Sequence, residues 1–239
     1  MTRVLITRAE PDASEFADAC RSHGLDPILS PVMRIEIEKA DIDLADVGAI
    51  AFTSANGVRA FAANSPQRSL PVFAVGPVTG EAAKAAGFEY VSLAGGDVEA
   101  LAGHIASENA LVGKVLLHVA GADRAGDLVT ALTARGIAAR RQTLYRAEAA
   151  SALSAQAEAS LRTESGLWVT FFSPRTVRLF LALAEKAGLA SRLPEMRAAC
   201  LSAAVAEAAA AVAWGGIVVA CDRTAESMLE TIIGEGDRA

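Results

Sequence analysis

The 239-residue sequence is poor in the residues that build disulfide frameworks and metal sites. Its three cysteines, Cys20, Cys200 and Cys221, are odd in number and scattered, and no CxxC motif occurs. This pattern fits the reducing cytosol better than a secreted disulfide scaffold, so we expect a cytoplasmic protein. The three histidines show neither HxxxH nor any other ligand spacing. Because zinc needs several convergent nitrogen or sulfur ligands, we expect no metal site.

Positive charge is also scarce. The chain has 22 Lys and Arg residues against 28 Asp and Glu residues, a net charge of −6, and its pI is near 5.2. A nucleic-acid surface needs a basic face for counterion release, so nucleic acid is not an expected partner. Nucleotide fingerprints are missing as well, since there is no GxGxxG, no GxxxxGK[ST] and no Thr-x-Thr-Gly loop for a flavin phosphate.

Membrane-length hydrophobic runs are limited to one stretch, residues 198–221. It consists mostly of alanine, carries Glu207, and breaks at Gly215-Gly216 before the β-branched run 217–219. We interpret it as strand, helix and strand, so no membrane partner is expected. The N-terminal residues 1–8 have too short an apolar run for a signal peptide and are typical of a first strand.

What the chain does contain is a repeated pattern of strand, tight turn and helix. Residues 49–52 form an apolar run of strand length, small polar residues follow at 53–57, and apolar residues then recur at helical spacing. The pattern returns from Val72, and its alanine-rich helix is expected to stop at Gly87. Strands that alternate with helices predict an α/β fold, with parallel sheets and helices on their faces.

Part of this pattern is duplicated. Residues 52–61, FTSANGVRAF, match residues 171–180, FFSPRTVRLF, at five of ten positions. The first strand, RVLI, likewise resembles KVLL further along the chain, and each is followed by a glycine stop, at Gly24 and Gly136. Two copies are too few for a repeat array and indicate a duplicated domain.

The order of the related pieces predicts that one α/β domain is inserted into the other. Grouping the pieces into complete sets gives a continuous domain at 38–146 and a discontinuous domain made of 1–34 and 152–239. The chain then crosses between the domains twice, in polar segments at about 33–40 and 143–154, which we expect to act as hinges. A cleft between two hinged domains is the default place for a small ligand.

The turns between strands and helices are the candidate binding elements. Each brings small residues to a helix N-terminus, where unpaired backbone N–H groups and the helix dipole favour anions. The alternative is that Ser54, Asn56, Ser173 and Thr79 only cap their helices. The recurrence of these turns in both halves of the sequence favours binding.

Five segments carry a resemblance that runs along nearly the whole chain. They are FTSANGVRAF, AVGPVTGEAAKAAGF, HVAGADRAGDLVTAL, the segment ending QTLYRAE, and FFSPRTVRLF. In this order and spacing they resemble the uroporphyrinogen-III synthase family. The resemblance implies two similar parallel-sheet domains of flavodoxin-like type, one inserted into the other and joined by two linker strands.

The resemblance also implies an activity. The implied protein is a cofactor-free lyase (hydro-lyase) of heme biosynthesis. It closes the linear tetrapyrrole hydroxymethylbilane to uroporphyrinogen III, inverting ring D and losing water. It would be a monomer, with a transient contact to hydroxymethylbilane synthase, the preceding enzyme.

Residue roles follow from the same resemblance. Tyr145 matches the family's tyrosine at the second linker and is the candidate catalytic residue. The substrate carries eight carboxylates, so the implied binding groups are local donors, mainly backbone N–H groups of the turns. The last third departs from the family pattern, because Ser202 stands where a Gly-Pro-x-Thr-like turn is expected. The implied substrate-binding residues are Thr7, Arg8, Ser54, Ala55, Asn56, Gly57, Gly76, Thr79, Gly80, Arg124, Ser173, Arg175, Thr176 and Ser202.

Two other classes of function fit two hinged α/β domains. One is a non-catalytic binding protein or sensor for a small polyanionic ligand, and the other is an unrelated cytosolic transferase. The expected lack of a signal peptide disfavours a periplasmic receptor.

Overall fold

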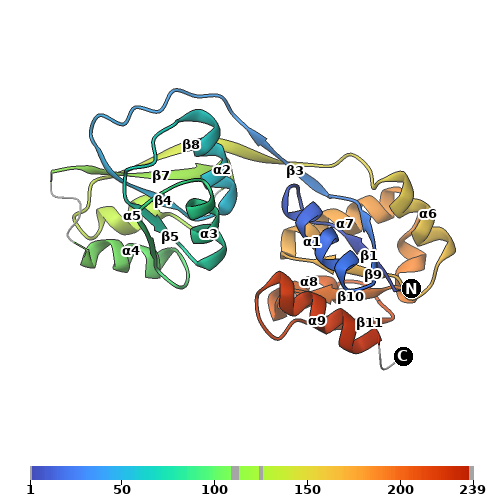
Figure 1. Ribbon diagram of the computed structural model, residues 1–239. Coiled ribbons are helices and arrows are strands. Elements are labelled where there is room, and N and C mark those ends of the chain that lie inside the picture. The colour runs from blue at the N-terminus through green and yellow to red at the C-terminus, as the bar shows by residue number, and fades with distance from the viewer. Residues whose placement is uncertain (1, 109–112, 124–125, 237–239) are drawn as a thin grey trace. The chain divides into compact units, whose positions relative to one another are not determined.

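The computed structural model describes residues 2–108, 113–123 and 126–236, and the chain divides into two compact units (Figure 1). Unit 1 consists of Met1–Arg34 and Glu148–Ala239, and unit 2 consists of Ile35–Ala147. Each unit has its own sheet, dominated by parallel pairs, with helices on both faces. The predicted fold class is therefore confirmed.

Unit 1 contains a five-stranded parallel sheet in the order β11-β10-β9-β1-β2. Along the chain, its strands have the flavodoxin-like order 2-1-3-4-5. The strands are β1 (Arg3–Ile6), β2 (Asp26–Leu29), β9 (Trp168–Phe171), β10 (Arg197–Cys200) and β11 (Gly216–Val219). The helices are α1 (Asp12–Ser22), α6 (Ala155–Thr163), α7 (Pro174–Lys186), α8 (Ala203–Ala209) and α9 (Ala225–Gly236), with a 3-10 helix, η1, at Ala190–Glu195.

Both faces of this sheet are buried. Val4 and Ile6 of β1 pack with α1 and α9, whereas Leu5, which points the other way, packs with α6, α7 and α8. In a strand covered on both faces, successive side chains are all buried, so its sequence is a continuous apolar run. This is why β1, β9 and β10 are so rich in hydrophobic residues.

Unit 2 contains a six-stranded sheet in the order β3-β8-β7-β4-β5-β6. Phe52, Leu117 and Val119 pack on one face with α2 and α3, while Ala51 and Leu116 pack on the other with α4 and α5. The strands are β3 (Met33–Ile37, which begins in unit 1), β4 (Val47–Phe52), β5 (Val72–Ala74), β6 (Val91–Leu93), β7 (Val115–Gly121) and β8 (Ala139–Ala149). The helices are α2 (Ala55–Asn64), α3 (Pro77–Ala85), α4 (Val98–Ser107) and α5 (Leu128–Thr133).

The duplication seen in the sequence is a duplication of topology. Strands β8-β7-β4-β5-β6 repeat the order β2-β1-β9-β10-β11, although β7 and β8 come last in the sequence of unit 2. In each unit the matched phenylalanines join the strand to the following helix edge to face. The ring centroids of Phe52 and Phe61 lie 5.9 Å apart, and those of Phe171 and Phe180 lie 5.4 Å apart. This pair of rings keeps the central strand packed on its helix in both units.

The glycines predicted to stop the helices of the repeated pieces do so. Gly24 follows α1 with φ 74°, and Gly136 follows α5 with φ 75°. Both adopt the left-handed conformation that side chains disfavour, and their N–H groups bond back to Arg21 and Thr133 carbonyls.

The first linker segment, predicted at about 33–40, pairs with β8. The Glu38 N–H donates to the Leu144 carbonyl at 2.8 Å, and the Ala150 N–H donates to the Val32 carbonyl at 2.9 Å. From the first bond to the second, the residue number falls from 38 to 32 on one strand and rises from 144 to 150 on the other. The two strands therefore run antiparallel here. Side chains add the ion pairs Arg34–Glu148 and Arg146–Glu36 at 2.7 and 2.6 Å.

The cysteines are free thiols, with Cys20 and Cys200 buried and Cys221 exposed. Burial raises the pKa of Cys200 to about 12 and, against an opposing effect of Arg21, that of Cys20 to about 11. Both buried thiols therefore stay protonated and serve as packing groups. No helix within the described residues is both long and apolar enough to span a membrane.

Replacing Phe180 with Ala should lower the free energy of unfolding of unit 1 by about 3–5 kcal/mol, because the cavity left beside Phe171 and Trp214 cannot collapse fully. Both tryptophans of the chain, Trp168 and Trp214, lie in unit 1, so their fluorescence in a urea titration reports on this unit. The matched control is Arg178→Ala, an exposed position on the same helix. An unchanged urea midpoint for Phe180→Ala would contradict this account of the core.

Candidate functional site

Each unit has a point at which the order of its strands reverses. It lies between β1 and β9 in unit 1 and between β7 and β4 in unit 2. In open parallel sheets, ligands bind beyond the carboxyl ends of the strands at this point. The predicted site residues can therefore be located relative to these two edges.

In unit 1, six predicted residues lie at one edge of the sheet. They follow strands that run parallel, so the strand ends and the helix N-termini after them share that edge. Thr7 and Arg8 follow β1; Ser173, Arg175 and Thr176 form the start of α7 after β9; Ser202 precedes α8 after β10.

Most of these side chains are already bonded within the unit. The Thr7 hydroxyl is buried and donates to the Thr170 carbonyl at 2.6 Å, tying β1 to β9. Arg8 pairs with Asp12 at 2.6 Å and lies 4.2 Å from the centre of the Phe172 ring. Thr7 and Arg8 thus both have bonding partners within unit 1.

The helix starts in unit 1 differ in their caps. Ser173 and Thr176 form a reciprocal capping box, in which the Thr176 N–H donates to the Ser173 hydroxyl and the Ser173 N–H donates to the Thr176 hydroxyl, both at 3.2 Å. Ser202 occupies the N-cap position of α8 with extended backbone, and its side chain accepts no capping bond. Arg175 lies half-buried in the first turn of α7.

In unit 2, the predicted turn residues begin α2 and α3. Ser54 caps α2, where its hydroxyl accepts from the Asn56 N–H at 3.2 Å, and the Asn56 side chain accepts from Arg59 at 2.9 Å. Gly76 is the N-cap of α3, with Thr79 and Gly80 buried in the first turn. Capping is thus confirmed for Ser54 and Ser173, whereas the cap of α3 is Gly76 and not Thr79.

Two predicted glycines lie in tightly packed positions and are not needed for backbone conformation. Neither Gly57 nor Gly80 has a positive φ. A Cβ on Gly57 would lie 3.1 Å from the Val119 carbonyl oxygen, and one on Gly80 would meet the end of the Leu93 side chain. The first turn of α2 therefore packs closely against β7 at Gly57.

A cavity of about 380 Å³ lies at the reversal point of unit 2. We call it the β4–β7 pocket. It contains two of the predicted residues, Ser54 and Tyr145. Its other lining residues are Thr53, Val75, Gly96, Asp97, Val98, His118, Ala120, Gly121, Asp123, Gly126 and Arg141.

Tyr145 reaches this pocket because of a shift in the pairing of β7 with β8. Ala120 pairs with Thr143, but Gly121 pairs with Tyr145, so Leu144 is an extra residue on β8 and its side chain enters the core. Such bulges redirect the side chains next to them. A Cβ on Gly121 would lie 2.7 and 2.9 Å from atoms of the Tyr145 ring and 3.2 Å from its hydroxyl. Only glycine leaves room for the phenol at the end of β7.

His118 and Arg141 are neighbours across β7 and β8 in the same pocket. The His118 Nε2 lies 3.2 Å from the Thr53 hydroxyl, and its Nδ1 is buried without a partner among the described residues. Burial and, to a lesser extent, the positive charge of Arg141 lower the pKa of His118 to about 4, against an opposing effect of Asp127. His118 is therefore a neutral hydrogen-bonding group at pH 7.

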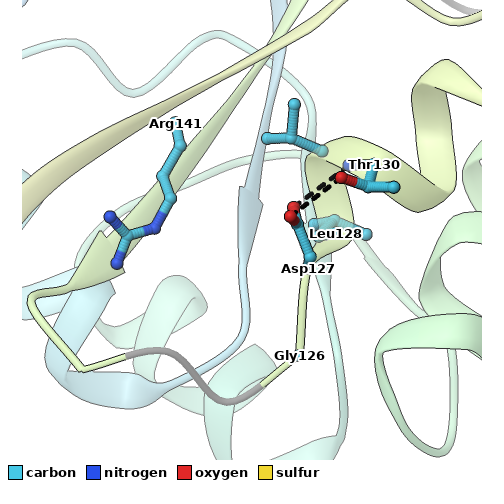
Figure 2. A pocket seen from close by; sticks show the side chains of 6 residues that line it. Gly126, Asp127, Leu128, Thr130 and Arg141 are labelled. Atoms are coloured by element: carbon cyan, nitrogen blue, oxygen red, sulfur yellow. Dashed lines mark hydrogen bonds between the residues drawn. The ribbon is translucent and has the colours of Figure 1, made fainter.

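A second, smaller hollow adjoins Arg141. Figure 2 shows Arg141 on one side of it and Asp127 with Thr130 on the other. Asp127 caps α5, accepting from the Thr130 N–H at 3.1 Å and from its hydroxyl at 2.8 Å. The predicted binding residue Arg124 lies outside the described residues. Across the described part of the chain, no three His, Cys, Asp or Glu side chains are grouped so that they could hold a metal ion.

Among the pocket residues that the sequence did not predict, Gly121, His118 and Arg141 surround Tyr145 or its strand pair. In the sequence, the spacing of His118 from the other histidines bears only on metal binding. Alternation along β8 could have placed Arg141 and Thr143 on one face, and Gly121 stands inside a quoted motif. Their meeting depends on the pairing of β7 with β8, which lies outside any local pattern.

The fold and the site together define a two-unit α/β protein of flavodoxin-like topology, with small residues and helix N-termini at the carboxyl edge of each sheet. A family described as uroporphyrinogen-III synthase HemD matches residues 14–230. The chain belongs to the uroporphyrinogen-III synthase family.

Solved structures agree in fold. Uroporphyrinogen-III synthetase from Helicobacter pylori is similar with a TM-score of 0.66 and 17% identity, over 98% of this chain and 99% of that one. A mutant uroporphyrinogen III synthase from the extremely thermophilic bacterium Thermus thermophilus gives a TM-score of 0.55 and 17% identity, over 100% of both chains. A comparison with curated proteins finds no match.

The neutral state of His118 predicts a pH effect on stability. Between pH 6.5 and about 4, the unfolded chain takes up a proton at this ring and the folded chain does not, so acidification favours unfolding. We expect the stability difference between the wild type and His118→Gln to fall by about 3 kcal/mol from pH 7 to pH 4, and to change little below pH 4. Urea unfolding followed by circular dichroism at several pH values measures it. His23→Gln, at an exposed position, is the control, and a constant difference for His118→Gln would refute the prediction.

Gly57 and Gly103 form a matched pair for the close packing at α2. Both are helical, but a Cβ on Gly103 meets nothing within 4 Å. Gly103→Ala should stabilise the protein by about 0.5–1 kcal/mol through helix propensity. Gly57→Ala should instead destabilise it by about 1–3 kcal/mol, because the methyl group presses on the Val119 carbonyl. Equal thermal shifts of the same sign would show that α2 does not need glycine there.

Proposed function

We propose that this chain cyclises hydroxymethylbilane to uroporphyrinogen III, with inversion of ring D and loss of water. The observation that carries the proposal is the family match over residues 14–230. It places the protein among the enzymes of tetrapyrrole biosynthesis. Nothing in the fold or the comparisons favours a non-catalytic binding protein or sensor.

The proposed chemistry is dehydration followed by carbon–carbon bond formation. The hydroxyl of the hydroxymethyl group leaves as water, assisted by the pyrrole nitrogen, and an azafulvene remains. The substituted carbon of ring D attacks it to give a spiro intermediate, which fragments and closes again with ring D inverted. A reaction of this type needs a held conformation more than a strong acid or base.

Local donors are proposed to hold the substrate's carboxylates. The chain is acidic, with a net charge of −6, so its overall field does not attract eight carboxylates. The starts of α2 and α3 in unit 2 and of α7 and α8 in unit 1 carry backbone N–H groups that suit anions. Because Ser54 and Ser173 already cap their own helices, we assign binding mainly to these backbone groups.

Tyr145 is proposed as the hydrogen-bond donor to the departing hydroxyl. Its placement in the β4–β7 pocket, with its hydroxyl beside Gly121, supports this role. Negative charge develops on the leaving oxygen, so a fixed phenol donor stabilises the transition state more than the ground state.

We infer a hydro-lyase that acts as a cytoplasmic monomer without a cofactor, and that receives its unstable substrate through a transient contact with hydroxymethylbilane synthase. The scattered free cysteines support the reducing compartment.

The activity is tested by adding the protein to freshly made hydroxymethylbilane and separating the macrocycles by isomer. We expect the inverted isomer, formed faster than spontaneous closure. If only the uninverted macrocycle appears, at the spontaneous rate, the proposal fails.

In the same assay, Tyr145→Phe should slow turnover by roughly ten- to a hundredfold, because a hydrogen bond to a charged group is worth about 1.5–3 kcal/mol. Activity should not vanish, since the pyrrole nitrogen can expel the hydroxyl once the substrate is held. The ring is retained, so the thermal midpoint should barely move. Tyr90→Phe, at the other and exposed tyrosine, is the matched control. An unchanged kcat/KM for Tyr145→Phe would show that the hydroxyl has no catalytic role and that the residue serves only in packing.

A further inference from the structure

Arg141 makes hydrogen bonds on both sides of the shift in the β7–β8 pairing that places Tyr145. Its guanidinium donates from Nη1 to the Thr143 hydroxyl at 2.9 Å and from Nη2 to the Gly121 carbonyl. Thr143 and Gly121 flank the extra residue of β8, one on each strand. Arg141 therefore bonds to both sides of the register shift.

Gly121 is also the residue nearest to the tyrosine ring from β7. A Cβ there would overlap the Tyr145 ring, at 2.7 Å from Cε2. One residue further, the Ala122 N–H donates to the Tyr145 carbonyl at 2.8 Å. The backbone of β7 at 121–122 thus contacts Tyr145 through its ring and its carbonyl, and Arg141 holds that backbone.

The surroundings of Arg141 favour this single arrangement. His118 lies opposite Arg141 across the strand pair and is neutral, so it does not repel the guanidinium. The Nε2 of His118 is in hydrogen-bond contact with the Thr53 hydroxyl. Asp127, on the far side of the smaller hollow, is bonded to Thr130 (Figure 2). A planar fork with several fixed donors suits a bridge between two oxygens, which the single ammonium of a lysine cannot copy.

We propose that Arg141, acting through Gly121 and Thr143, is a positioning residue that sets the orientation of the Tyr145 ring. The inference deepens the proposed function and rests on it for the catalytic meaning of Tyr145, but the placement itself can be tested without activity. Removing the bridge should let the bulge relax and turn the phenol away from its place beside Gly121.

The two tyrosines of the chain allow a direct measurement. In protein labelled with 3-fluorotyrosine, ¹⁹F NMR gives one resonance for Tyr145 and one for Tyr90, assigned with the Tyr→Phe variants. Tyr90 is 62% exposed and serves as the internal reference for a folded unit 2. Arg141→Met should shift or broaden the Tyr145 resonance and leave that of Tyr90 in place.

The matched control is Arg140→Met, on the same strand. Arg140 bonds to the Asp43 carbonyl and the Asp46 carboxylate, away from Tyr145. Thr143→Val removes one oxygen of the bridge at constant shape, so it decides the matter if Arg141→Met does not fold. A Tyr145 resonance at the wild-type position in folded Arg141→Met or Thr143→Val protein overturns the proposal.

Turnover gives a second readout. Arg141→Met should lower kcat by about ten- to a hundredfold with little change in KM, because a displaced catalytic group weakens the transition state more than binding. In the Tyr145→Phe background the same substitution should cause no further loss. Losses that multiply would show that Arg141 acts independently of Tyr145 and would overturn the proposal. If the wild type proves inactive on hydroxymethylbilane, the proposed function fails, and the NMR result still decides the placement.

Discussion

Parallel hydrogen bonding between the central strands, β1 with β9 and β7 with β4, determines where the candidate site residues lie. Parallel strands end at the same edge of a sheet, and each of these four strands is followed in the chain by a helix. This backbone pairing brings helix N-termini and small residues together at one edge of each sheet. The same constraint operates in both units, because both have the same strand order.

Within that frame, the side chains and the backbone have different tasks. The side chains of Ser54, Ser173, Thr7 and Arg8 bond to partners inside their own units. These bonds restrain the turns, and donors that are oriented before a ligand arrives lose little on binding. Capping and anion binding are therefore compatible interpretations of the same turns.

Local sequence predicted the fold class and the strand ends, because buried parallel strands, helix starts and glycine stops each depend on a few adjacent residues. The match of 52–61 with 171–180 indicated the duplication, and the paired phenylalanines show what it preserves. The surroundings of Tyr145 could not be predicted in this way. They depend on an extra residue in β8, on the space left by Gly121 and on a neutral His118 beside Arg141, all of which arise only when β7 and β8 pair.

The discontinuity of unit 1 has a consequence for how the protein is made. Val4 of β1 pairs with Trp168 of β9, so the sheet of unit 1 is completed only after most of the chain has been synthesised. All of unit 2 precedes β9, and its own sheet can form while the ribosome is still adding residues. Closing the long loop between β1 and β9 carries an entropy that grows only with the logarithm of its length. When unit 2 has already folded, the loop that must be closed is effectively shorter. Because synthesis proceeds from the N-terminus, we expect unit 2 to be the first part of the protein to fold.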